Sequence, residues 1–427
     1  MKKIIIFLNV TFLLLSLNAE LLHFSIDTAQ KTQQTKILLA FIAHENKNLE
    51  EIGIAVKNAL EFTNQITTTI AFFPKLISKQ EALQQKTNGF NYIVFIADNK
   101  DNFEWHLFEI DNGSMKKGKK ITKKCTVLRS CAYALADSLY EAFTNEPGFF
   151  STKIAYTKQI PLSKGKHYTH LFIADYDGSN EQCIIGTPTI NVSPRWNKDI
   201  NRPLLFYSEN TNTNMRLVAV DMHKKRTIAS NFDGLNMLPA FSPDGKSVVY
   251  CATRGSGNCQ LYYWSNKVLK KITQNEGNNF FPIFSGDGTI IYFSSDFESK
   301  YPQIYAYNLQ THTLEKITHD GYCVSPSFCA QSNKLAYTKS VQGIMQVFCY
   351  DIASGKHSQL TFDKAQKEDC SWSLCDNFLL CSVADFKSSR IALFNTITQE
   401  YRYLTDAKDH CSSPTWSGIY AEYPIVT

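Results

Sequence analysis

A pattern of residues recurs about every 44 positions between Trp196 and Trp416. Its first anchor is an aromatic residue, with successive spacings of 45, 43, 44, 44 and 44 residues. A second anchor follows each of the first five, and then come an alternating apolar segment and a threonine. A fixed period of about 40–45 residues is typical of β-propeller blades. The first anchors are Trp196, Phe241, Phe284, Phe328, Trp372 and Trp416, and the second are Tyr207, Tyr250, Tyr292, Tyr337 and Cys381.

Each repeat contains four short segments in which apolar and polar residues alternate. Turn sequences such as Ser242–Gly245 separate them. Alternation with a period of two indicates strands, so each repeat predicts one four-stranded antiparallel blade. Because a single blade cannot bury both of its faces, we expect the blades to stack around an axis, with the bulky anchors between them.

The flanks of the repeats predict how the ring closes. Five complete repeats run from Trp196 to just before Trp416, and one further strand follows. Three strand-like segments precede Trp196 without a first strand of their own. We therefore expect an all-β six-bladed propeller of WD40-like (PD40) repeats, closed by one C-terminal plus three N-terminal strands, which removes open sheet edges. The three N-terminal segments are Lys153–Thr157, His170–Tyr176 and Glu181–Gly186.

Residues 20–150 lack this period and mix helical and strand patterns, which predicts an α/β N-terminal domain. Ser78 and Glu81 form a capping-box pattern, and residues 111–113 predict a hairpin turn. A boundary is expected at Asn145–Gly148, so the propeller would span 151–427. The expected strands are Lys36–Ala43, Thr67–Phe73, Tyr92–Ala97, Phe103–Ile110 and Ile121–Val127, and the expected helices are Glu50–Asn64, Ser78–Lys86 and Arg129–Thr144.

The first 19 residues have the pattern of a cleaved signal peptide. Lys2 and Lys3 precede an apolar run from Ile4 to Leu17, and the small residue Ala19 ends the segment. The alternative is an uncleaved membrane anchor, although this run is short for a membrane-spanning helix. An exported chain is expected, and its formal charge of +5 does not indicate a nucleic-acid partner.

Twelve cysteines raise the question of disulfides in an exported chain. Most of them occupy repeat positions, where a small buried apolar residue would serve equally well. Cys251 and Cys259 flank a turn and are the best local candidates for a disulfide, and Cys125 with Cys131 is a second pair. No metal site is predicted, because His167 and His170 lack a completing motif.

The join between the two regions carries a family resemblance. Gly148-Phe149-Phe150 leads into Ser151–Tyr156, and the turn Asp175–Gly178 follows one hairpin later. An alternating segment, residues 20–27, begins the expected mature chain. Together with the leader, the α/β domain and the repeats, these segments resemble the TolB family, the periplasmic components of the Tol-Pal cell-envelope system.

The resemblance implies a non-enzymatic periplasmic adaptor, monomeric and without a cofactor, that supports outer-membrane integrity and cell division. Its propeller would bind the lipoprotein Pal, and its N-terminal segment would bind TolA. The same alternation would also suit an edge strand of the chain's own α/β domain. The segment residues that would contact TolA are Glu20, Leu22, Phe24, Ile26 and Asp27.

The candidate Pal-binding residues lie in the loops just before the aromatic anchors. Such loops surround the channel mouth of a propeller and form a broad docking surface. The alternative is a propeller that binds a small ligand or sugar in its channel. A peptidase of the prolyl oligopeptidase type is not favoured, because no G-x-S-x-G motif occurs. The candidates are Leu235, Asn236, Asn278, Asn279, Phe280, Tyr322, Lys367, Glu368, Asp369, Asp409 and His410.

Overall fold

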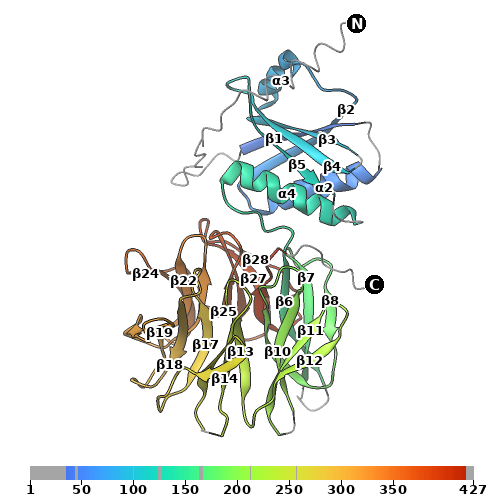
Figure 1. The fold of residues 1–427 in the computed structure, drawn as a ribbon. Helices are drawn as coiled ribbons and strands as arrows, with labels where there is room; N and C mark the ends of the chain where they lie inside the picture. The colour runs from blue at the N-terminus through green and yellow to red at the C-terminus, as the bar shows by residue number, and fades with distance from the viewer. Residues whose placement is uncertain are drawn as a thin grey trace.

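The computed structural model describes residues 35–43, 47–99, 101–123, 127–162, 167–211, 213–255 and 257–419. An α/β unit lies over one end of a ring of β-sheets (Figure 1). The predicted signal peptide (residues 1–19) and the TolA segment (residues 20–27) lie outside the described residues.

A five-stranded sheet with the order β2-β1-β3-β4-β5 forms the α/β unit. Helices α2 and α4 lie on the side of this sheet nearer the ring (Figure 1). The predicted capping box is present, since the Ser78 hydroxyl accepts from the Glu81 backbone N–H and the Glu81 carboxylate accepts from the Ser78 N–H. The elements are β1 (Thr35–Ile42), α2 (Lys47–Phe62), β2 (Ile66–Phe73), α3 (Lys79–Gln84), β3 (Tyr92–Asp98), β4 (Asn102–Glu109), β5 (Ser114–Thr122) and α4 (Leu128–Thr144), with a 3₁₀ turn at Gln85–Asn88.

The last strand of this sheet differs from the prediction. We expected Ile121–Val127, whereas β5 covers Ser114–Thr122. The turn at 111–113 returns the chain at once along β4, so that Glu104 lies opposite Lys120. Lysine side chains then line an exposed edge strand, where like charges discourage pairing with another sheet.

The ring contains four separate four-stranded sheets and one eight-stranded sheet. In each four-stranded sheet, the strands pair in chain order. Their bounds are β13 (Asn236–Phe241), β14 (Val248–Ala252), β15 (Gln260–Ser265) and β16 (Val268–Lys271); β17 (Asn279–Phe284), β18 (Ile290–Ser295), β19 (Gln303–Asn308) and β20 (Leu314–Lys316); β21 (Cys323–Cys329), β22 (Lys334–Val341), β23 (Ile344–Asp351) and β24 (Lys356–Gln359); and β25 (Gln366–Trp372), β26 (Phe378–Ala384), β27 (Ser389–Asn395) and β28 (Tyr401–Tyr403).

The eight-stranded sheet replaces the two separate blades that we expected there. Strand β8 is short, so it leaves one end of β7 uncovered, and Thr169 of β7 pairs there with Ile190 of β9. At the other side of the sheet, β29 pairs antiparallel with β6. The strands are β6 (Lys153–Pro161), β7 (His167–Asp175), β8 (Gln182–Ile185), β9 (Ile190–Trp196), β10 (Leu204–Asn210), β11 (Met215–Asp221), β12 (Arg226–Ser230) and β29 (Cys411–Trp416).

Buried aromatic residues join the α/β unit to the ring. Phe149 and Phe150 are fully buried and pack against Tyr140 of α4 and against Tyr176. Phe149 also contacts Trp416 of β29. One continuous apolar cluster therefore spans α2, α4 and the adjacent ends of the ring strands.

Two carboxylates complete this junction. Asp137 of α4 accepts hydrogen bonds from the backbone N–H groups of Phe150 (2.7 Å) and Ser151 (3.1 Å). Asp175 of β7, which is 1% exposed, accepts a hydrogen bond from the Tyr133 hydroxyl of α4 at 3.3 Å and is paired with Lys153. These contacts fix where the chain leaves α4 and enters the ring.

None of the cysteines among the described residues is cross-linked in the structure. All of them are buried except Cys183, which is half-buried. Burial at repeat positions confirms the apolar role that we predicted for most of them. The Cys251 and Cys259 thiols are in contact, and burial raises the pKa of Cys251 well above its usual value. Cys125 lies outside the described residues.

Candidate functional site on the propeller

Six strands line the channel through the ring: β9, β13, β17, β21, β25 and β29. Each contains an irregularity in its pairing with the next strand. A non-glycine residue takes a left-handed conformation there, which marks a β-bulge. These residues are Ser193, Leu238, Phe281, Ser325, Asp369 and Ser413, with φ between 51° and 55°.

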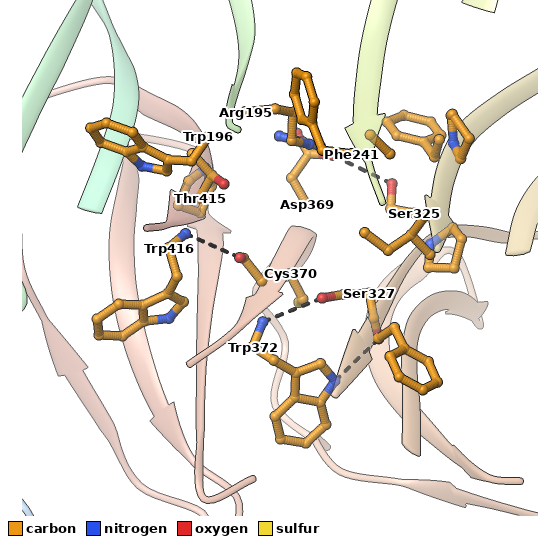
Figure 2. A pocket seen from close by; sticks show the side chains of 18 of the residues that line it. Arg195, Trp196, Phe241, Ser325, Ser327, Asp369, Cys370, Trp372, Thr415 and Trp416 are labelled. Carbon is orange, nitrogen blue, oxygen red and sulfur yellow. Dashed lines mark hydrogen bonds between the residues drawn. The ribbon is translucent and has the colours of Figure 1, made fainter. Parts of the chain in front are cut away.

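The bulges surround a cavity of about 200 Å³. Its lining is mainly apolar and hydroxyl-bearing, with the charged residues Arg195, Lys198 and Asp369. Figure 2 shows Asp369 between neighbouring strands, where its carboxylate accepts hydrogen bonds from the hydroxyls of Ser413 (2.9 Å) and Ser325 (3.4 Å). Burial lowers the pKa of Arg195, and the Asp369 charge opposes this shift. This wall is therefore held by its own hydrogen bonds.

Hydrogen bonds also connect neighbouring channel strands directly. The backbone N–H of Trp416 donates to the Ser371 hydroxyl at 3.2 Å, and that of Trp372 donates to the Ser327 hydroxyl at 3.3 Å (Figure 2). The Trp372 indole N–H donates to the Ser327 carbonyl at 3.1 Å. The aromatic anchors thus bind one sheet to the next and stiffen the channel.

The candidate Pal-binding residues divide into a buried and an accessible set. Asn236, Asn279 and Lys367 are each 0% exposed. The Asn236 amide donates to the carbonyls of Met215 (2.9 Å) and Phe232 (2.6 Å), and the Lys367 ammonium is paired with Asp363. Asn236 and Asn279 thus connect neighbouring sheets, whereas Lys367 holds its own loop. The three side chains are not available to a partner. The accessible set comprises the exposed Tyr322, Glu368 and His410 and the half-buried Leu235, Asn278, Phe280, Asp369 and Asp409.

The candidate Pal-binding loops lie at the end of the ring away from the α/β unit, which we call the distal end. Exposed aromatic residues that we did not predict lie at this end too. Phe362 is 68% exposed, Phe386 is fully exposed, and Tyr301 contacts Tyr322 edge to face at 6.5 Å. Their loops adjoin the strand ends where Ser295 pairs with Gln303 and Ala384 pairs with Ser389. An aromatic residue within an otherwise polar loop is the sequence signal for this group. We call Tyr301, Tyr322, Phe362 and Phe386 the distal aromatic group.

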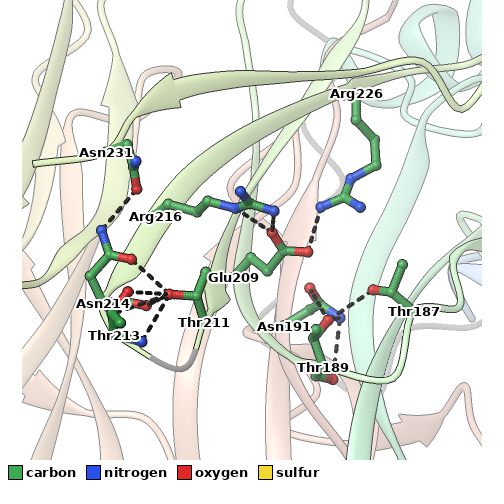
Figure 3. A network of polar contacts seen from close by, with 10 residues as sticks. All are labelled: Thr187, Thr189, Asn191, Glu209, Thr211, Thr213, Asn214, Arg216, Arg226 and Asn231. Atoms are coloured by element: carbon green, nitrogen blue, oxygen red, sulfur yellow. Dashed lines mark hydrogen bonds and ion pairs between the residues drawn. The ribbon is translucent and has the colours of Figure 1, made fainter.

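A buried ion-pair network fixes strands near this distal end. Glu209 of β10, 1% exposed, is paired with Arg216 of β11 at 2.5 Å and with Arg226 of β12 (Figure 3). Nearby, the Asn191 amide donates to the carbonyl of Thr169 at 2.7 Å. Both carboxylate oxygens of Glu209 are engaged by arginine, so the network compensates the buried charge and links β10, β11 and β12.

The described part of the chain contains no group of three or more His, Cys, Asp or Glu side chains that could hold a metal ion. Among its helices, none is both long and apolar enough to cross a membrane.

Comparisons with known proteins agree with this architecture. Residues 140–420 match the family described as PD40, the TolB beta propeller domain. Two Tol-Pal system proteins TolB from Francisella tularensis, of subspecies mediasiatica and tularensis, are 29% identical over 253 residues, which are 56% of this chain. The match spans 57% and 56% of these relatives, so the chain covers little more than half of their length.

Solved structures show the same fold. The crystal structure of TolB from Acinetobacter baumannii superposes with a TM-score of 0.75 at 23% identity, covering 90% of this chain and 97% of that one. A nidogen/laminin complex reaches a TM-score of 0.50 at 9% identity, covering 63% of this chain and all of that one. The family match covers most of the chain and coincides with the ring, and the chain therefore belongs to the TolB β-propeller family.

Proposed function

We propose that this chain is a non-enzymatic, exported adaptor of the Tol-Pal system that binds the lipoprotein Pal at the distal end of its propeller. The observation that carries the proposal is the distal aromatic group beside the accessible candidate residues. Tyr301 and Tyr322 of this group contact each other, and Phe362 and Phe386 are exposed at the same end of the ring. Exposed apolar side chains gathered at one end of a protein are typical of a binding site. Aromatic side chains also supply most of the binding energy in many interfaces.

The role of the α/β unit follows from the same proposal. Residues 20–27 would bind TolA, and residues 1–19 would direct export to the periplasm. The domains would be 20–150 and 151–427, and the chain would act as a monomer that supports outer-membrane integrity and cell division. An extended segment can add to a partner's sheet through its backbone, which suits the alternating sequence of residues 20–27.

We further propose that the eight-stranded sheet corresponds to two blades, which makes six blades in all. The six bulged channel strands support this count, because each begins one set of four strands. The cavity between them, at about 200 Å³, is smaller than the roughly 300–1,000 Å³ of small-molecule sites. We therefore propose no small-molecule ligand for the channel.

The test measures binding of purified Pal to the full chain and its variants. Tyr322→Ala and Phe362→Ala should each weaken binding at least about tenfold, as expected for interface aromatics. The matched control is Ile200→Ala, because Ile200 is 57% exposed but lies in the loop between β9 and β10 at the opposite end. Equal affinities for all four proteins would contradict binding at the distal end, and no binding by the wild type would contradict the assignment of Pal.

A further inference from the structure

The sheet β25–β28 departs from the other repeats at two positions, and both are cysteines. In the other five channel strands, the residue after the left-handed bulge residue is proline: Pro194, Pro239, Pro282, Pro326 and Pro414. In β25 this residue is Cys370. The residue opposite the bulge on the neighbouring strand is aromatic in the other five cases (Tyr156, Tyr207, Tyr250, Phe293 and Tyr337), and it is Cys381 in β26.

The two cysteines contact each other. Pairing is regular on both sides of the bulge, at Glu368 with Ser382 and at Ser371 with Leu380, which leaves Cys370 facing Cys381. Their sulfur atoms are 2.7 Å apart. Both side chains are buried, at 7% and 0% exposure. Two departures from one internal repeat therefore meet at a single contact.

We propose that Cys370 and Cys381 form a disulfide. A proline fixes its own φ and so stiffens the bulge in the other channel strands. A cross-link between β25 and β26 would restrain the bulge that lacks this proline. That bulge carries Asp369, whose carboxylate accepts from Ser325 and Ser413 in neighbouring strands. The disulfide would thus hold Asp369 in the channel wall.

Formation proceeds by exchange with a donor disulfide, either of an oxidase or of oxidised glutathione. The thiolate of one cysteine attacks the donor, forms a mixed disulfide and releases one donor thiol. The second cysteine then attacks the first, forms the Cys370–Cys381 bond and releases the other donor thiol. Two electrons pass to the donor, and the two protons of the cysteine thiols are released and taken up by the donor thiolates. Because burial raises the pKa of the Cys370 thiol well above its usual value, the exchange belongs to folding, before burial.

Cys375 provides an internal control. It is also buried, but its sulfur lies 3.3 Å from the Ser373 hydroxyl instead of beside a second sulfur. The full chain is unfolded, refolded in glutathione buffers of increasing oxidised fraction, and quenched with N-ethylmaleimide in denaturant. Chymotryptic cleavage after Trp372 and Phe378 then places the three cysteines on separate peptides for mass spectrometry.

We expect linked Cys370 and Cys381 peptides, with N-ethylmaleimide on Cys375. N-ethylmaleimide on both Cys370 and Cys381 at the most oxidising ratio would overturn the proposal. Formation in the cell rests on the proposed export, but this measurement does not. A chain that links the pair in buffer yet stays inside the cell would contradict the export and leave the disulfide intact.

Thermal unfolding separates a cross-link from simple packing. Oxidised wild-type protein should unfold about 5 °C above the reduced protein, as expected for a disulfide that closes a short loop. In Cys381→Ala this redox difference should vanish, whereas Cys375→Ala should keep it. A Cys381→Ala variant that retained the full redox difference would overturn the proposal.

Discussion

The two ends of the propeller use aromatic side chains in opposite ways. At the end next to the α/β unit, Phe149 and Phe150 are fully buried and contact α4 and the ring. At the distal end, Phe362 is 68% exposed and Phe386 is fully exposed. The same residue type therefore has two consequences. An aromatic side chain that is buried between two units contributes to stability. One that is exposed on a single unit remains available for association.

The largest expected effect comes from removing a buried ring at the junction. Phe149→Ala should lower the free energy of unfolding by roughly 3–5 kcal/mol, because it leaves a cavity among packed aromatics. Phe386→Ala, the matched change at the distal end, should stay within about 0.5 kcal/mol of the wild type. Guanidinium unfolding measures both values. Similar losses for the two variants would show that the ends do not differ in the way we describe.

A smaller effect is expected where the backbone approaches α4. A Cβ atom on Gly148 would lie 2.4 Å from the Cα atom of Asp137, so Gly148→Ala must displace the junction. We expect a loss of about 1–3 kcal/mol, typical of overpacking. The control is Gly418→Ala, since a Cβ there meets no atom within 4 Å. If Gly148→Ala unfolds at the same temperature as this control, the junction is looser than its contacts indicate.

The smallest expected effect is a change in how the free energy of unfolding depends on pH. Burial raises the pKa of Asp137 from 3.8 to about 6, although hydrogen bonds from Phe150 and Ser151 oppose the shift. Between these values the folded state holds more protons than the unfolded chain, so stability falls as pH rises from about 4 to 6. Asp137→Asn should remove up to about 2 kcal/mol of this dependence.

Melting temperatures between pH 3.5 and 7 test this expectation. Asp233→Asn, in an exposed loop of the distal end, is the control and should keep the wild-type slope. An unchanged slope in Asp137→Asn would mean that Asp137 does not titrate in this range.

The sequence predicted the positions of the strands well, because the period and the alternation report directly on which segments can pack in a sheet. It did not predict the direction of side chains near a bulge. The left-handed residue interrupts the alternation, so residues before it, such as Asn236 and Lys367, point into the protein instead of toward a partner. The sequence predicted Tyr292 as the second anchor of the third repeat. The strand pairing instead places Phe293 opposite the bulge of that repeat.

Contacts between distant segments were harder to predict. The single pair of Thr169 with Ile190 merges eight strands into one sheet, and it depends on the short length of β8. Tyr322 of the distal aromatic group was predicted, but Tyr301, Phe362 and Phe386 were missed. The repeat draws attention to shared positions, whereas these three residues lie in loops that differ between repeats. A binding surface made of such differences leaves little periodic signal.

The pairing of β29 with β6 bears on how the chain is made. Ser412 and Thr157 hydrogen-bond although 255 positions separate them in the sequence. During synthesis or transport the α/β unit emerges well before β29, so it can fold while β6 still lacks its neighbour. Non-local pairing of this kind is slow and exposes unpaired strand edges to aggregation. The ring should therefore be most vulnerable to misfolding and proteolysis in the interval before β29 arrives.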